Sequence, residues 1–173
     1  VVIGSNEDRA IEVMKELYRP LYLIETPIVI TSLEAAELIK YAANAFLATK
    51  ITFINEVANL CDAIGCDVHD VARGMGMDNR IGRKFLHPGP GYGGSCFPKD
   101  TLALVRTAQQ AAAPLKIVEA VVAVNDARKL RMADRVIAAC GGAVAGKTIA
   151  VLGLTFKPNT DDMRDAPAIE IAR

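Results

Sequence analysis

The longest pattern of apolar and polar positions in this chain is helical. No glycine or proline interrupts the sequence between Thr31 and Gly65, and Thr31 with Glu34 fits a capping box at the start. We therefore expect a helix of roughly thirty residues there. Its apolar positions cover most of the helix circumference, which is typical of burial on several sides: Leu33, Leu38, Ile39, Phe46, Leu47, Ile51, Phe53, Ile54, Val57, Leu60 and Ile64. The pattern predicts a helix that pairs with a second subunit.

The segment before this helix has shorter patterns. Residues Val1–Gly4 and Ile28–Thr31 predict short strands, and Glu7–Tyr18 predicts an amphipathic helix capped by Ser5 or Asn6. A strand, a helix and a strand form the end of an α/β unit, and a parallel sheet needs more strands than these two. We assign residues 1–31 to the end of an α/β domain.

Further helices are expected after the long one. Asp67–Gly74 predicts a short helix, Gly74–Pro98 a glycine-rich loop, and Lys99–Ala112 and Leu115–Cys140 two longer helices, the second closed by Gly141 and Gly142. These elements complete a central helical domain over residues 32–142.

A second α/β piece is expected over residues 143–173. Thr148–Leu154 is continuously apolar, as in an interior strand of a parallel sheet, and Pro167 suits the first turn of a final helix. The predicted fold class is thus a mainly α central domain with a long dimerisation helix, flanked by truncated α/β, Rossmann-like pieces.

Composition excludes several function classes. The 173 residues carry 20 Lys and Arg and 20 Asp and Glu, so no net field favours nucleic acid or an anionic membrane, and we expect neither as a partner. The four cysteines lack C-x-x-C spacing and only two histidines are present, so no metal site is expected. No leader or long apolar run is evident, which indicates a cytoplasmic setting with reduced thiols.

Cys96 is the strongest candidate for chemistry. It lies in a run from His87 to Asp100 that contains four glycines and three prolines, just before a predicted helix. Glycines let backbone N–H groups approach a ligand, and a helix N-terminus stabilises negative charge, so this thiol is expected to react as the thiolate. The alternative is a small buried cysteine next to a turn.

Lys40 and Asn44 are a second candidate pair. They lie four residues apart on the long helix, so a cation and an amide donor share one face. Apolar neighbours indicate an interior position, where the pair could stabilise an oxyanion; alternatively, Lys40 reaches solvent and Asn44 bonds a neighbouring carbonyl. Asp100, one turn after Cys96, could activate a water or simply complement the helix N-terminus.

Three segments of the sequence carry a family resemblance: Leu38–Ala48, Gly91–Asp100 and Gly153–Arg164. Together they resemble the UDP-glucose 6-dehydrogenases, NAD-dependent oxidoreductases of nucleotide-sugar metabolism and polysaccharide biosynthesis. Such enzymes oxidise the C6 alcohol of UDP-glucose twice, through a thiohemiacetal and a thioester on a catalytic cysteine, and yield UDP-glucuronate. The resemblance implies NAD as cofactor, UDP-glucose as substrate and a homodimer formed by the long helix. It also implies that residues 1–31 end the NAD-binding domain and that 143–173 begin the UDP-binding domain.

The same resemblance assigns roles to individual residues. Cys96 would be the nucleophile, Lys40 and Asn44 would stabilise the oxyanion and contact the substrate, and Asp100 would assist the water. Lys99 and Arg164 would face NAD. The remaining substrate contacts would be Arg80, from a neighbouring subunit, with Phe85, Leu86, His87, Pro88, Gly89, Gly93 and Lys157.

The sequence also departs from the family. It lacks the G-x-G-x-x-G fingerprint of the NAD-binding domain and a glutamate that the family uses near the sugar, so we expect this piece to be inactive alone. Two other interpretations remain open: a sister dehydrogenase acting on GDP-mannose or a UDP-N-acetylhexosamine, and a non-catalytic helical dimerisation module with a structural Cys96.

Overall fold

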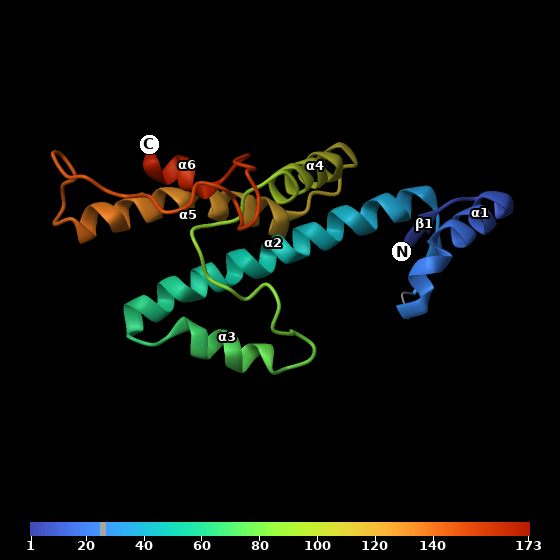
Figure 1. The fold of residues 1–173 in the computed structure, drawn as a ribbon, viewed down its shortest axis with the longest axis horizontal. Coiled ribbons are helices and arrows are strands. Elements are labelled where there is room, and N and C mark those ends of the chain that lie inside the picture. The colour runs from blue at the N-terminus through green and yellow to red at the C-terminus, as the bar shows by residue number, and fades with distance from the viewer. Residues whose placement is uncertain (25–26) are drawn as a thin grey trace. The chain divides into compact units, whose positions relative to one another are not determined.

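The computed structural model describes residues 1–24 and 27–173 and is mostly helical (Figure 1). It separates into two compact units, residues 1–43 and 44–173, and the boundary falls inside one long helix. None of the helices in the described ranges is long and apolar enough to cross a bilayer.

The first unit contains the predicted strand, helix and strand. β1 (Val2–Gly4) and β2 (Val29–Thr31) pair in parallel, with Val2 opposite Val29. Between them lie α1 (Asp8–Tyr18) and a short 3-10 helix, η1 (Arg19–Ile24). A side chain at Gly4 would collide with Ala36, because its Cβ would lie 2.7 Å from that of Ala36. The expected strand, helix and strand are confirmed, and the two strands are parallel.

The long helix is α2 (Leu33–Ile64), and it has nearly the predicted bounds. Its expected capping residue is wrong by one position: the backbone N–H of Ala35 donates to the hydroxyl of Ser32, not of Thr31, at 3.2 Å. Thr31 cannot cap the helix because it still belongs to β2. The expected capping box is replaced by a single serine cap.

The second unit adds the other helices. They are α3 (Val68–Gly76), α4 (Phe97–Gln110), α5 (Lys116–Ala139) and α6 (Pro167–Ala172). α5 packs against both α4 and α6. Asp67 caps α3 by accepting from the backbone N–H of His69 at 2.8 Å. α4 begins at Phe97, two residues earlier than predicted, because Pro98 fits its first turn.

A small cluster joins α2, the glycine-rich loop and α5. Ala48, Tyr92 and Val121 are buried together, and Ile51 and Phe97 pack against them. The glycine-rich loop is thereby attached to the core through a tyrosine.

The strand predicted over Thr148–Leu154 is wrong. The structure assigns no strand to these residues, and Leu152 is 94% exposed. An interior strand of a parallel sheet needs hydrogen-bonding neighbours on both sides, and the two strands that the structure describes pair with each other in the first unit. The described residues offer the apolar run no strand to pair with.

Candidate active site

The N-terminus of α4 positions the candidate nucleophile and the candidate water-activating carboxylate. Cys96 is the capping residue of this helix and is exposed. The backbone N–H of Asp100 donates to the carbonyl of Cys96 at 2.8 Å. Asp100 therefore lies one turn of α4 after Cys96. Asp100 is only 3% exposed. An accessible thiol thus lies one helical turn from a buried carboxylate.

The two oxygens of the Asp100 carboxylate each contact a different side chain. The amide Nδ2 of Asn44, on α2, donates to Oδ2 at 2.5 Å, and Lys99 Nζ lies 2.5 Å from Oδ1. A buried carboxylate is stable only when such donors replace water. The contact brings together two residues that the sequence predicted separately, Asn44 and Asp100.

Lys40 does not have the predicted environment. It precedes Asn44 by one turn of α2, as expected, but it is exposed rather than interior. The apolar neighbours that suggested burial, Ile39 and Phe46, are themselves 42% and 65% exposed. The expectation failed because these neighbours line an open face of α2 instead of a core.

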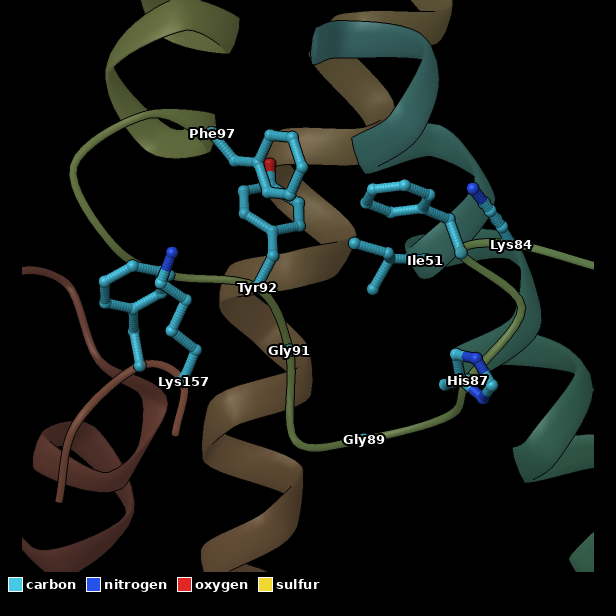
Figure 2. Close-up of a pocket in the computed structure, with 11 residues that line it drawn as sticks. Ile51, Lys84, His87, Gly89, Gly91, Tyr92, Phe97 and Lys157 are labelled. Atoms are coloured by element: carbon cyan, nitrogen blue, oxygen red, sulfur yellow. The ribbon is translucent and has the colours of Figure 1, made fainter. Parts of the chain in front are cut away.

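A cavity of about 460 Å³ lies between α2, the glycine-rich loop and the segment after α5 (Figure 2). The rings of Phe85 and Tyr92 each meet Phe97 edge to face, with centroids 6.2 and 5.9 Å away. The lining residues are Ile51, Lys84, Phe85, His87, Gly89, Gly91, Tyr92, Gly93, Phe97, Phe156 and Lys157. Five predicted substrate contacts are among them: Phe85, His87, Gly89, Gly93 and Lys157.

Basic side chains lie at opposite sides of this cavity. Lys157 Nζ lies 5.2 Å from the centroid of the Phe156 ring, and Lys84 and His87 lie across the loop from it (Figure 2). Aromatic faces with nearby cations suit a ligand that combines a planar ring with anionic groups.

The other predicted site residues lie outside this lining. Asn44, Cys96 and Lys40 are not among the described residues that line the cavity. Leu86 and Arg80 line a separate hollow with Phe46 and Phe53, and Pro88 is half-buried between His87 and Gly89. The Arg80 side chain is 90% exposed and is held by Asp78, whose carboxylate raises the pKa of the guanidinium.

The segment after α5 packs closely against the glycine-rich loop. A Cβ on Gly93 would lie 2.2 Å from the carbonyl oxygen of Asp165, and one on Gly94 would lie 2.5 Å from the Phe156 ring. The N–H of Gly94 donates to the carbonyl of Arg164 at 2.8 Å. Only glycine permits this approach, and Gly94 also has a positive φ of 85°. The segments Gly91–Asp100 and Gly153–Arg164 are therefore in direct contact, and a backbone hydrogen bond joins them.

Arg164 is thereby brought near the candidate nucleophile. The hydrogen bond to Asp162 is the main reason that the pKa of Arg164 is raised, and electrostatic interaction with Cys96 also raises it. The same ion pair, at 2.8 Å, lowers the pKa of Asp162 to about 2.

Sequence reasoning missed three polar residues beneath the loop. Asn125 and Arg128, on α5, and Asn55, on α2, are buried and bond to the loop backbone. They lie in helical segments with no motif around them. The only available signal was an Asn and an Arg at helical spacing that share one face of a predicted helix.

Comparison with known proteins decides the family. The central-domain model of the UDP-glucose/GDP-mannose dehydrogenase family matches residues 34–127, more than half of the chain. The chain belongs to this family. The UDP binding domain model of the UDP-glucose/GDP-mannose dehydrogenase family also matches, over residues 150–173.

Several members of the family are similar over the whole chain. The UDP-glucose 6-dehydrogenase of Rhizobium meliloti is 65% identical over 100% of this chain and 40% of its own length. UDP-glucose 6-dehydrogenase TuaD of Bacillus subtilis is 53% identical over 98% of this chain and 36% of its own. The chain thus spans about 40% of the length of these curated relatives.

Solved structures in the family have the same fold. A UDP-glucose dehydrogenase from Pyrobaculum islandicum matches with a TM-score of 0.91 and 41% identity, over 99% of this chain and 39% of that one. A UDP-D-ManNAc dehydrogenase from Pyrococcus horikoshii matches with a TM-score of 0.84 and 27% identity, over 99% of this chain and 40% of that one.

Proposed function

We propose that this chain carries the catalytic cysteine and part of the sugar-nucleotide site of an NAD-dependent UDP-glucose 6-dehydrogenase. The observation that carries the proposal is the exposed Cys96 at the start of α4, one turn from a buried Asp100 that is bonded to Asn44. The 65% identity to a UDP-glucose 6-dehydrogenase supports UDP-glucose as the sugar nucleotide.

The proposed role of Cys96 follows from the chemistry of the second oxidation. The first oxidation removes a hydride and a proton from the C6 alcohol and yields an aldehyde. Attack of the Cys96 thiolate on the aldehyde carbon forms a C–S bond and a thiohemiacetal, whose C–H can then be lost as hydride. NAD, when bound, supplies the hydride acceptor for both oxidations. The second hydride loss leaves a thioester on Cys96.

Asp100 and Asn44 are proposed to act in hydrolysis of this thioester. Water adds to the thioester carbon as the Asp100 carboxylate accepts its proton, and the C–S bond then breaks to release the carboxylate product and the Cys96 thiolate. Negative charge develops on the carbonyl oxygen at each addition, where Lys40 and Asn44 would serve as donors. Their spacing of one helical turn on α2 supports a shared target.

The aromatic cavity is proposed to bind the rest of the substrate. Phe85, Gly89, Gly93 and Lys157 would contact the UDP-sugar, with His87 beside them and Leu86 and Pro88 in the same stretch. Aromatic faces suit a pyrimidine ring, and Lys157 suits a diphosphate.

Two cationic residues are proposed to contact NAD. The Lys99 and Arg164 side chains are 67% and 70% exposed, and each forms an ion pair with an adjacent carboxylate. These features fit outer contacts to the anionic part of NAD. The described residues include no glycine-rich turn between a strand and a helix that would cradle its diphosphate.

A homodimer through α2 is part of the proposal. Phe46, Phe53 and Leu60 follow one another at intervals of seven residues and are 65%, 49% and 58% exposed. A seven-residue apolar repeat forms a stripe along one side of a helix, which is the pattern of a helix-to-helix seam. Arg80 lies in the same hollow as Phe46 and Phe53, which supports its reach into a partner's site.

Replacement of Cys96 by serine tests the proposed function. We expect the longest expressed form of the protein to reduce two equivalents of NAD per UDP-glucose, and Cys96→Ser to stop at the aldehyde or to accumulate a slowly hydrolysed ester. Product analysis by mass spectrometry distinguishes these outcomes. Cys66→Ser, which removes another exposed thiol, is the matched control. Undiminished UDP-glucuronate formation by Cys96→Ser would contradict the mechanism.

Two further measurements separate the alternatives. Faster oxidation of GDP-mannose or a UDP-N-acetylhexosamine than of UDP-glucose would assign the chain to a sister enzyme. Failure of Cys96 to react with a mild alkylating agent, together with no oxidation of any sugar nucleotide, would indicate a non-catalytic dimerisation module.

A further inference from the structure

The loop that lines the aromatic cavity is held by side chains of neighbouring helices. Within residues 83–93 the structure describes a turn at 84–85 but no helix or strand. The loop nevertheless supplies Phe85, Gly89, Gly91 and Tyr92 to the cavity wall. A loop with no helix or strand of its own keeps one shape only if other groups fix it.

Asn125 of α5 fixes the middle of this loop. Its Oδ1 accepts from the backbone N–H of Tyr92 at 2.8 Å, and its Nδ2 donates to the carbonyl of Tyr92 at 3.2 Å. One carboxamide thus satisfies both polar groups of a buried backbone unit. Asn125 is itself only 3% exposed, so water does not compete for these bonds.

The loop backbone lies directly on this carboxamide. A Cβ on Gly91 would lie 3.0 Å from Asn125 Oδ1, and Gly91 has a φ of 123°, a region that only glycine adopts easily. The close approach of the loop backbone to Asn125 therefore requires a glycine at position 91.

A second anchor fixes the loop three residues earlier. The N–H of Gly89 donates to Asn55 Oδ1 at 2.8 Å, and the carbonyl of Gly89 accepts from Arg128 Nε at 2.9 Å. Arg128 also donates to the carbonyl of Asn55 at 3.0 Å, which ties this anchor to α2. Gly89 is thus held through both backbone groups by α2 and α5, and Tyr92 is held through both of its backbone groups by α5.

We propose that Asn125 is a positioning residue for the sugar-nucleotide site, acting through the backbone of Tyr92. The Tyr92 ring stands edge to face against Phe97, so a shift of its backbone moves one aromatic wall of the cavity. The inference rests on the proposed function, because it assumes that this cavity holds the substrate. The Asn44–Asp100 contact lies on α2 and α4 and does not include Asn125.

The expected signature is a change in KM with little change in kcat. Asn125→Ala removes both bonds to Tyr92. Asn125→Asp keeps an acceptor for the N–H but turns a second oxygen toward the Tyr92 carbonyl, which repels it. Both variants are expected to raise KM for UDP-glucose about tenfold or more, since small misplacements of binding groups have effects of this size, and to leave kcat within about threefold.

The experiment compares these variants with Gln109→Ala in the longest expressed form of the protein. Gln109 Nε2 donates a hydrogen bond to Glu119 Oε1 of α5 at 3.0 Å on the exposed surface, away from the loop. A role in folding alone would lower the active fraction, and therefore kcat, without changing KM. A raised KM in both Asn125 variants but not in Gln109→Ala supports the proposal, and an unchanged KM overturns it. If Asn125→Ala does not fold, the KM of Asn125→Asp alone tests the proposal.

Hydrogen exchange separates failure of this inference from failure of the proposed function. If the unmodified protein neither binds nor oxidises UDP-glucose, the proposed function fails and exchange in residues 85–95 judges the positioning role. Faster exchange there in Asn125→Ala than in Gln109→Ala supports it. Equal exchange in the two variants overturns it.

Discussion

At the scale of single residues, the contact between Asn44 and Asp100 has the clearest consequence. It joins two side chains that are 56 positions apart in the sequence and buried at 6% and 3% exposure. Loss of the amide removes a proposed oxyanion donor and also leaves the carboxylate with one donor fewer. The two groups should therefore behave as one unit in catalysis.

A double-mutant cycle measures this coupling. Asn44→Ala and Asp100→Asn are each expected to lower kcat by about 10²-fold, the size of effect seen when an oxyanion donor is lost, and the double variant should lose less than the product. Steady-state kinetics of the three variants checks it. Small reductions of kcat in the single variants that simply multiply in the double variant would contradict a shared catalytic role.

At the scale of elements, the segment 153–165 depends on the pair of Asp162 and Arg164. The guanidinium lowers the pKa of Asp162 to about 2 from its ordinary 3.8. Because the folded-state pKa is the lower one, the stabilisation is fully present above about pH 4 and is lost as the pH falls toward 2. Asp162→Asn should increase hydrogen exchange in this segment at pH 6, and the difference from the unmodified protein should disappear near pH 2.

Asp161→Asn is the control for this pH dependence. It makes the same change in charge on the adjacent, exposed residue. If Asp161→Asn and Asp162→Asn give the same exchange at pH 6, the ion pair does not hold the segment.

Sequence patterns predicted the secondary-structure elements well where an element forms its hydrogen bonds within itself. The long helix could be predicted from its uninterrupted pattern, and α6 from Pro167, because helices form their hydrogen bonds internally. Thr148–Leu154 failed because a strand requires partners that its own sequence does not contain.

The candidate site was predictable only in part, for a related reason. Cys96 and Asp100 could be found because they are adjacent in a distinctive motif, and five of the cavity residues lie in or near recognisable segments. The burial of Lys40 was wrongly predicted, because apolar neighbours on a helix indicate a contact face without indicating what covers it. Asn125 was missed because its partner, Tyr92, is 33 residues away.

At the scale of the whole molecule, the apolar stripe of α2 predicts self-association. Phe53→Asp would place a charge in the middle of the proposed seam, where burial without a partner is strongly unfavourable. We expect the unmodified chain to be a dimer at micromolar concentration and Phe53→Asp to be monomeric or insoluble. Light scattering coupled to size exclusion gives the mass.

Val13→Asp is the matched control for the dimer. Val13 is an exposed apolar residue of α1, at 59% exposure, outside the stripe. It should leave the mass unchanged. A well-folded monomer for the unmodified chain would contradict the proposed seam.

The open segment from Thr148 to Leu154 has a consequence for the behaviour of the chain in concentrated solution. Its β-branched and apolar residues, with Ile149, Val151 and Leu152 at 45%, 47% and 94% exposure, carry backbone groups that are free to pair with the same segment of another copy. Such segments template cross-β stacking. Expressed by itself, the chain should form thioflavin-positive fibrils from this segment, and Leu152→Lys should suppress them, since stacked lysines repel one another.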